Sequence, residues 1–316
     1  MSNRRENGLH TVERLNASNL SEVEKLYTIV YNKQVVPGYF AKKYNTAFTG
    51  IGYTGYMAYN PQGVPIAFYA VIPCFIKCGG EIILAAQSAD TMTHPDHRNK
   101  GLFIELALTT FQLCRDLNIR LLFGFPNQNS LPGFVNKLDW QVAHTMDCFI
   151  IHAGSFPFKT IMGKIPLLNK LYTKYQQHTL THYFSKQTGI SNSVFENGYG
   201  GIYRDESYLK YKAYGNTSVL QTGNSLLWIK FSEILLIGDI LVQPDDFDDM
   251  IYTLKKLARK LGIRQIHFHT SPGTTLHGLF AMRFNSTPSF PVIFKVLGDD
   301  LQTGKIKFTS ADIDTF

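Results

Sequence analysis

Several common sequence features are missing from this chain of 316 residues, and each absence excludes a class of protein. No stretch approaches the ~20 consecutive apolar residues that cross a bilayer, and the polar N-terminus lacks the apolar segment of a secretory signal. The motif G-x-x-x-x-G-K-[ST], a G-x-G-x-x-G after a strand, and the G-x-S-x-G of α/β-hydrolases are also missing. We therefore expect a globular cytoplasmic protein that is neither a kinase, a dehydrogenase nor a typical α/β-hydrolase.

Cysteine is scarce, and none of the four cysteines belongs to a C-x-x-C pair. The sequence therefore predicts neither a zinc ribbon nor a thioredoxin-type site. We expect Cys74, Cys78, Cys114 and Cys148 to be buried free thiols.

Patterns of metal-ligating residues are equally sparse. His94, Asp96 and His97 lie within one short turn and have no remote partner in the sequence. His267 and His269 alternate along one predicted strand, with no Asp, Glu or Cys cluster beside them. We expect packing or hydrogen-bonding roles for these histidines and no bound metal.

Basic residues exceed acidic ones, 31 to 24, which gives a net charge of +7 and favours an anionic partner. No run of five or more Lys or Arg occurs, and neither a zinc finger nor an RNA-binding signature is present. Nucleic acid is therefore not expected as a partner. A phosphorylated cofactor is the simplest explanation of the charge.

The length of the chain favours two modest domains over one large one. In the first, Val23, Leu26 and Val30 recur at helical spacing and predict a helix. Strand-like runs at 53–59, 64–76 and 81–93 are separated by turn signals and predict an antiparallel meander. A helix at about 101–117, a strand at 120–125, a short helix within 127–138 and a strand at 140–151 follow. These elements predict a mixed α/β domain that ends near residue 150.

The order of elements recurs in the C-terminal part of the chain. Residues 151–202 are interpreted as a helical connector, after which Asp205 is expected to cap a helix. Strands near 218, near 226 and at 234–242, a helix at 245–261 and a strand at 265–270 then repeat the earlier order. Residues 117–121 are similar to 261–265, and 131–134 to 276–279. Two copies of one fold explain this similarity, and chance is the alternative.

The segment from His94 to Phe103 carries the clearest chemical signal, because it lies between a predicted strand and a predicted helix. The first N–H groups of a helix lack internal partners and face the positive end of the helix dipole, so they favour a bound phosphate. Gly101 permits close approach of the backbone, and Arg98 and Lys100 add positive charge. The segment is therefore predicted to bind a phosphorylated ligand.

This segment resembles the pyrophosphate loop of the GNAT superfamily, which reads Arg/Gln-x-x-Gly-x-Gly/Ala. Arg98-x-x-Gly101-x-Phe103 matches that loop except at its last position, where Phe103 replaces a small residue. Asn127-x-x-Ser130 and the stretch 134–140 resemble later parts of the same family pattern. The resemblance covers about residues 1–150.

The resemblance implies an α/β (α+β) fold of two GNAT-like domains, each a mixed, mainly antiparallel sheet flanked by helices, with the second copy degenerate. Residues 1–150 would bind acetyl-CoA or another acyl-CoA, 151–202 would connect the domains, and 203–316 would wall the acceptor site. The expected cofactor-binding residues lie in one strand, the loop after it and a later turn: Met92, Thr93, Arg98, Asn99, Lys100, Gly101, Leu102, Phe103, Asn127 and Asn129.

Family chemistry implies direct attack of an amine on the thioester, so the protein supplies proximity and proton transfer. Asp90 is the first candidate for the general base and His94 the second; the alternatives are a hydrogen-bonded strand residue and a loop-ordering histidine. Val135 stands where many members carry the tyrosine that protonates the departing thiolate. Tyr59, Tyr69 or a water would have to substitute.

The second copy lacks the phosphate loop, because residues 243–249 contain four aspartates at the expected helix start. It should not bind CoA. We expect an acyl-CoA-dependent N-acyltransferase acting on a small-molecule amine, with an amino sugar suggested by a group of tyrosines at 199–214. A non-catalytic acyl-CoA sensor and a Fem-like aminoacyl transferase are the alternatives. The sequence is compatible with a homo-oligomer.

Overall fold

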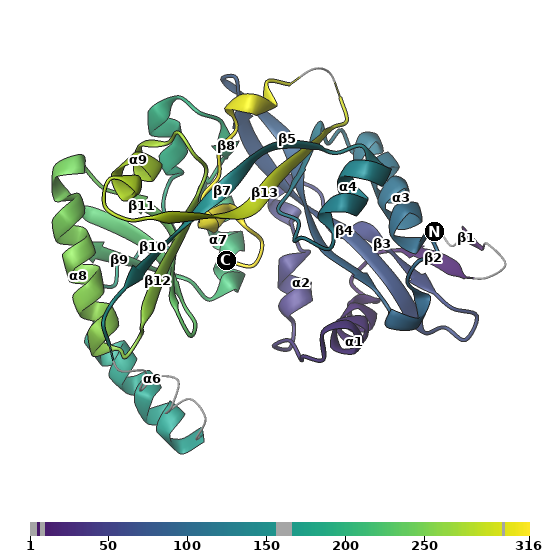
Figure 1. The fold of residues 1–316 in the computed structure, drawn as a ribbon. Coiled ribbons are helices and arrows are strands. Elements are labelled where there is room, and N and C mark those ends of the chain that lie inside the picture. The colour runs from purple at the N-terminus through teal and green to yellow at the C-terminus, as the bar shows by residue number, and fades with distance from the viewer. Residues whose placement is uncertain (1–4, 7–9, 156–165, 299–300) are drawn as a thin grey trace. The chain divides into compact units, whose positions relative to one another are not determined.

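The computed structural model describes residues 5–6, 10–155, 166–298 and 301–316, and the chain divides into two compact units (Figure 1). The first unit contains Met1–His144 and Pro291–Gly304, and the second contains Thr145–Phe290 and Lys305–Phe316. Each unit is therefore assembled from two separate stretches of chain. Residues 156–165 of the expected connector lie outside the described part.

The first unit holds an antiparallel meander between helices. Its strands are β1 (Arg5–Glu6), β2 (Thr11–Arg14), β3 (Thr54–Tyr59), β4 (Pro65–Cys78), β5 (Glu81–Thr93) and β6 (Leu121–Gly124). Its helices are α1 (Leu20–Tyr31), α2 (Tyr39–Lys43), α3 (Leu102–Asp116) and α4 (Leu131–Leu138), with short 3-10 turns η1 (Ala47–Thr49) and η2 (Pro95–His97). Strand β7 (Gln141–His152) begins in this unit and ends in the second.

Neighbouring strands of the first unit run in the order β1-β2-β3-β4-β5-β6, followed by β13 (Ser286–Val296). All pairs are antiparallel except β5 and β6, because α3 connects these two strands as a crossover. Tyr69 and Val71 of β4 pack in the core cluster with α3 and α4. Phe68, whose side chain points to the other face, contacts Tyr44 at the end of α2. Helices therefore cover both faces of the sheet (Figure 1).

The second unit contains α6 (Pro166–Leu180), η3 (Ser193–Asn197), β8 (Gly201–Ile202), α7 (Glu206–Lys212), η4 (Ala213–Gly215), β9 (Ser218–Thr222), β10 (Ser225–Phe231) and β11 (Leu235–Leu241). It continues with η5 (Pro244–Asp246), α8 (Phe247–Lys260), β12 (Gln265–Thr270) and α9 (Thr275–Ala281). The turns η6 (Thr303–Lys305) and η7 (Ser310–Asp312) follow β13. Asp205 caps α7, as expected, by accepting a hydrogen bond from the Tyr208 N–H.

Both units share one strand arrangement. Strands β9, β10 and β11 form an antiparallel meander, β12 pairs parallel with β11 after helix α8, and β7 pairs antiparallel with β12. The first unit repeats this order as β3, β4, β5, then β6 after α3, then β13. The last strand of each half of the chain therefore completes the sheet of the other half.

Amphipathic helices bury the core of each unit. In α8 the residues at helical spacing Phe247, Met250, Leu254 and Leu257 are at most 2% exposed and pack on the sheet. Burial of each such side chain contributes roughly 1.5–3 kcal/mol. The mixed α/β class with a mainly antiparallel sheet flanked by helices is therefore confirmed.

The four cysteines are buried free thiols, as the sequence predicts. Within the described ranges, no helix has both the length and the apolar character needed to cross a membrane.

Candidate functional site

Strands β5 and β6 pair over only three residues each. Residues 85–87 of β5 pair with 121–123 of β6, after which β6 ends at Gly124 while β5 continues to Thr93. A Cβ atom added at Gly124 would lie 3.5 Å from the Cβ of Ser88, so the strands are still close at this point. In the described part of the chain, no segment pairs with β5 on this side beyond Gln87. We call the space along residues 88–93 the β5–β6 opening.

A β-bulge in β5 lies at this opening. Phe68 pairs with Met92 but Ala70 pairs with Ala89, so β5 contains one extra residue against β4. Asp90, in the bulge, has φ 47°, which is uncommon for a residue with a side chain. The extra residue inverts the alternation of side chains, because Ser88 lies opposite Val71 on the α3 face while Met92 lies opposite Phe68 on the α2 face.

The bulge directs Asp90 towards α2. The Asp90 carboxylate oxygen Oδ2 lies 2.6 Å from Lys43 Nζ and accepts a hydrogen bond of 2.7 Å from the Tyr44 hydroxyl. Lys43 is 1% exposed and Asp90 is 14% exposed. Sequence reasoning missed Lys43 and Tyr44, because no local pattern marks a buried lysine. The carboxylate is therefore held at a fixed position and is still reached by solvent.

On the other face of the opening, Tyr69 and Ser88 form a hydroxyl pair 3.0 Å apart. Tyr69 is fully buried, and burial raises its pKa well above the ordinary value. Tyr59, the other tyrosine proposed from the sequence, lies on β3 opposite Pro65 of β4. Burial and the charge of Glu13 raise its pKa. Of the two tyrosines, Tyr69 is the one that contacts the strand lining the opening.

The loop that follows β5 ends in a group of unpaired N–H groups. Gly101 is the N-cap of α3 with φ 80°, and its cap position has no side-chain hydrogen bond. The first intrahelical bond is donated by the Glu105 N–H to the Gly101 carbonyl. Within the described ranges, the N–H groups of residues 99–104 have no hydrogen-bond partner. This is the arrangement that binds an anion at a helix start.

Backbone conformation and charge fit an anion at this point. Asn99 has φ 61° and Gly101 has φ 80°, so two left-handed residues turn the chain within the loop. A Cβ at Gly101 would meet nothing within 4 Å. Arg98 and Lys100 are both exposed beside the unpaired N–H groups. Leu102, by contrast, is buried in the core, so only its backbone N–H is available to a ligand.

Phe103, which stands where the family pattern has a small residue, packs away from the loop. Its ring contacts Phe134 at 5.3 Å and Tyr69 at 6.1 Å between centroids, so it points towards α4 and β4. A Cβ added at Gly133 of α4 would lie 2.9 Å from the Phe103 ring. The large residue on α3 is therefore accommodated by a glycine on α4.

His94 has a structural role in the turn before the loop. Its ring atom Nδ1 accepts a hydrogen bond of 3.2 Å from the Asp96 backbone N–H, and the backbone N–H of His94 donates to the Ile66 carbonyl. The other expected residues are placed as follows. Thr93 ends β5, Asn127 accepts hydrogen bonds from the Asn129 and Ser130 N–H groups before α4, and Asn129 is exposed.

In the second unit, the equivalent space contains the C-terminal segment. Strands β11 and β12 pair only over 235–237 with 266–268, and Thr270 then bridges to Thr309 instead of β11. Turn η7 packs against both strands. Phe316 is 1% exposed, and a Cβ at Gly238 would lie 2.1 Å from its ring. The separation of β11 and β12 is therefore filled by the chain itself.

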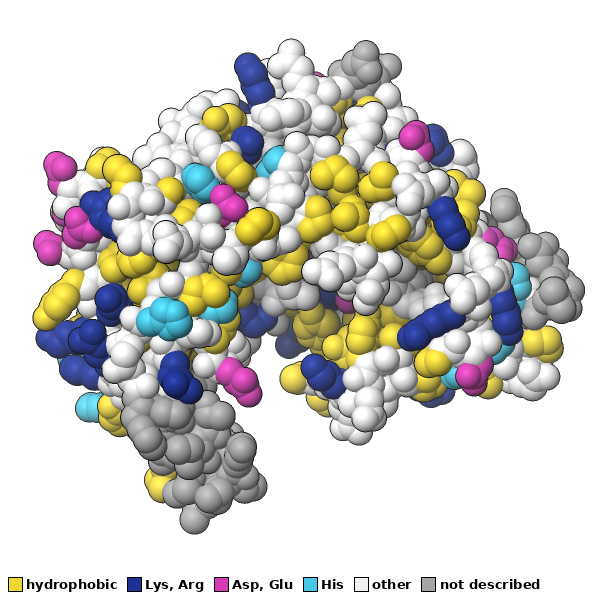
Figure 2. Space-filling model, in the orientation of Figure 1, with side chains coloured by type: hydrophobic (Ala, Val, Ile, Leu, Met, Phe, Trp, Pro, Cys, Tyr) yellow, Lys and Arg dark blue, Asp and Glu magenta, His cyan; other side chains and the backbone are white. Residues whose placement is uncertain are grey.

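The helix that would receive a phosphate in the second unit is acidic at its start. Asp248 and Asp249 lie in the first turn of α8, and Figure 2 shows acidic side chains at one end of this helix and basic ones at the other. At the β11 bulge, Asp239 is paired with Arg204 at 2.6 Å, and Arg204 also pairs with Asp312 at 2.7 Å. All three side chains are 0% exposed. This region is closed to an anionic ligand.

One expectation about the second unit is wrong. The sequence suggested that no cysteine accompanies His267 and His269, but Cys148 lies directly opposite His269 in the pairing of β7 with β12. The ligand atoms of these three residues all lie within 4.8 Å of one another. Local sequence could not reveal this cluster, because the pairing joins residues of different halves of the chain.

Residues 11–143 match the family model described as an acetyltransferase (GNAT) domain. This region contains the β5–β6 opening, Asp90 and the start of α3. Comparison with curated protein sequences finds no match.

Several solved structures share the fold of nearly the whole chain. A GCN5-related N-acetyltransferase from Kribbella flavida matches with 12% identity and TM-score 0.56, over 91% of this chain and 72% of that one. A putative acetyltransferase from Pyrococcus horikoshii matches with 11% identity and TM-score 0.54, over 94% of both chains. The Saccharomyces cerevisiae N-myristoyltransferase with bound myristoyl-CoA matches with 10% identity and TM-score 0.57, over 92% and 79%. At these identities the likeness concerns the fold.

Proposed function

Because residues 11–143 form a GNAT acetyltransferase domain, which places the chain in the GNAT superfamily, we propose that it transfers an acyl group from acyl-CoA to an amine. In this proposal acyl-CoA, the acyl donor, binds to the first unit and not to the second. A bound acyl-CoA would supply an acyl group already activated as a thioester.

The contrast between the two strand openings carries this proposal. In the first unit the opening is lined by the unpaired edge of β5 and leads to N–H groups without partners at the start of α3. In the second unit the corresponding opening is filled by Phe316 and its neighbours, and α8 begins with aspartates. The first unit thus offers an open strand edge and unpaired N–H groups to a long anionic ligand, while the corresponding space in the second unit is filled.

Each part of the first site has a definite task in the proposal. The N–H groups of residues 99–104, with Arg98 and Lys100, would hold the pyrophosphate. The free edge of β5 at Met92 and Thr93 would pair with the amide groups of the pantetheine arm. Asn127 is engaged in its own turn through its carbonyl oxygen, so its side-chain NH₂ is the group left for a ligand.

Proton transfer is assigned to Asp90 on one face of the sheet and to Tyr69 with Ser88 on the other. Asp90 is preferred to His94 as the base, because Asp90 lies in the bulge beside the β5–β6 opening with a carboxylate that solvent still reaches, while His94 Nδ1 is used in its own turn. Lys43 and Tyr44 would hold the carboxylate in position for an incoming ammonium group. Tyr69, through Ser88, is the candidate donor of a proton to the departing thiolate.

The acceptor is proposed to be a small amine, and its class is left to experiment. Three of the tyrosines that suggested an amino sugar have other contacts: Tyr208 is 3% exposed, Tyr199 donates to the Gly273 carbonyl and Tyr214 to the Asp314 carbonyl. These contacts favour a packing role. The degenerate second copy, its expected role as a wall of the acceptor site and a cytoplasmic location remain predictions.

A thiol-release assay tests the proposal. The purified chain would be incubated with acetyl-CoA and a panel of amines that includes alkylamines, amino acids and amino sugars. We expect CoA release that depends on one acceptor class. Saturable binding of acetyl-CoA without turnover on any amine would favour the sensor, which Val135 motivates. If CoA neither binds nor raises the melting temperature, the donor assignment fails.

A further inference from the structure

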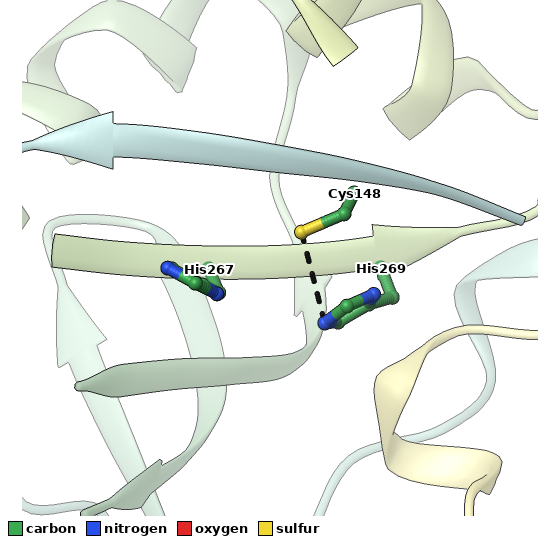
Figure 3. Close-up of side chains that lie close together, drawn as sticks. All are labelled: Cys148, His267 and His269. Atoms are coloured by element: carbon green, nitrogen blue, oxygen red, sulfur yellow. Dashed lines mark hydrogen bonds between the residues drawn. The ribbon is translucent and has the colours of Figure 1, made fainter. Parts of the chain in front are cut away.

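A cluster of three potential metal ligands lies on one face of the sheet in the second unit. Cys148 of β7 is the direct partner of His269 on β12, and His267 is two residues away on the same strand. Side chains two apart on a strand point to the same face, and directly paired residues also share a face. Figure 3 shows Cys148 and His269 facing each other across the two strands, with His267 beside them.

We propose that Cys148, His267 and His269 form a binding site for one zinc ion, with solvent as the fourth ligand. Thiolate and imidazole are the preferred ligands of Zn²⁺, and three protein ligands with one open position are common among its sites. Nothing in the acyl-transfer proposal uses these residues, so the two proposals stand or fall independently.

The separations are close to those of a tetrahedral site. Zn–S and Zn–N bonds of ~2.3 Å and ~2.05 Å place S and N about 3.6 Å apart. Cys148 Sγ lies 3.7 Å from His269 Nε2. The remaining separations are within 4.8 Å, so a shift of the His267 ring by about 1 Å would complete the site.

The outer nitrogen of each imidazole already has an oxygen partner. His269 Nδ1 lies 2.8 Å from Ser289 Oγ, and His267 Nε2 lies 3.2 Å from Gln265 Oε1. Metal-bound histidines usually donate their other N–H to an oxygen, which fixes the ring orientation and the tautomer. In this arrangement Nε2 of His269 and Nδ1 of His267 are left for the ion.

The surroundings favour a neutral ligand set that remains accessible. Cys148 is 6% exposed, while both histidines are only partly buried. Burial lowers the pKa of His269 to about 4, lowers that of His267, and raises that of the Cys148 thiol to about 11, so the three side chains are neutral at neutral pH without a metal. Zinc binding would displace the proton of the Cys148 thiol, which is released to solvent.

Cobalt titration tests the site directly, because a thiolate bound to Co²⁺ gives a charge-transfer absorption band. We expect metal-free protein to develop this band and to saturate at one ion per chain. The Cys78→Ser variant, which alters a thiol that is also 6% exposed but lies in the first unit, should keep the band. Absence of the band from the wild-type protein would overturn the proposal, whatever the variants do.

Zinc affinity, measured by competition with a chelating dye, assigns the ligands. Cys148→Ser and His269→Ala should each weaken binding by at least about 100-fold, and Ser289→Ala by about tenfold. His178→Ala, which removes an exposed histidine of α6, should leave the affinity within about twofold of the wild type. Unchanged zinc affinity in folded Cys148→Ser would contradict the assignment.

Discussion

The ammonium group of Lys43 lies 2.6 Å from the carboxylate of Asp90, and the Lys43 side chain is only 1% exposed. The pair joins the end of α2 to the bulge of β5, beside the β5–β6 opening. A buried ion pair is weak evidence for stability but costs several kcal/mol when one partner is removed. Its position at the β5–β6 opening therefore invites a test that separates stability from catalysis.

Asp90→Asn should destabilise the protein by about 3 kcal/mol, because the ion pair with Asp90 is lost while the Lys43 ammonium group stays buried. The double variant Lys43→Met/Asp90→Asn should recover most of that loss, as measured by urea unfolding. If Asp90 is the base, turnover in both variants should be at least about 100-fold lower than in the wild type. Recovery of turnover together with stability would show that Asp90 has only a structural role.

Gly101→Ala should weaken CoA binding by at least about tenfold, because φ 80° costs a residue with a side chain roughly 1–2 kcal/mol and distorts the phosphate loop. Gly80→Ala is the matched control. Gly80 has φ 89° and open space around its Cβ, as Gly101 does, but it lies in the turn between β4 and β5. Both variants should lose similar stability; equal losses of CoA affinity would count against the loop assignment.

Phe103 and Gly133 should be energetically coupled. Phe103→Ala should cost about 3 kcal/mol through the cavity beside Phe134, with CoA affinity changed less than about threefold. Gly133→Ala should destabilise the wild type through its 2.9 Å approach to the Phe103 ring, and less so in the Phe103→Ala background. The unfolding free energies of the wild type, the two single variants and the double variant give the coupling energy between the two positions. Additive effects, or a large gain in CoA affinity from Phe103→Ala, would contradict the packing described.

Arg204→Met should destabilise the second unit by about 3–5 kcal/mol, because Asp239 and Asp312 would be left buried without their cation. The chain has two tryptophans, Trp140 in the first unit and Trp228 in the second. In a Trp140→Phe background, fluorescence would therefore report unfolding around Trp228, whose ring lies 5.5 Å from the Arg204 guanidinium. Acetyl-CoA affinity below the unfolding transition should be unchanged; an unchanged Trp228 transition would mean that the ion pairs contribute little.

Local sequence was sufficient for the elements that position the first site. The meander followed from alternating runs and turn residues, and the predicted helix at 101–117 is observed as α3 at 102–116. The loop with Gly101 was found because the motif and its chemistry are contiguous in the chain. The observed burial of Leu102 and the packing of Phe103 depend on side-chain direction, which a motif does not specify.

Long-range pairings were beyond prediction from the sequence. Lys43 and Asp90 are 47 residues apart, and nothing in a helix end rich in lysine indicates that one of them is buried. The exchange of β7 and β13 between the two halves of the chain likewise leaves no periodic trace in the sequence. The proximity of Cys148 to His269 therefore follows only from the strand register, which the structure supplies.

Calorimetric titration of acetyl-CoA into the wild-type chain measures whether the protein binds the donor and at how many sites. We expect saturable binding with one ligand per chain, because among the described residues the first unit alone combines an open strand edge with unpaired N–H groups at a helix start. Two equivalent sites per chain, or no binding at all, would contradict it.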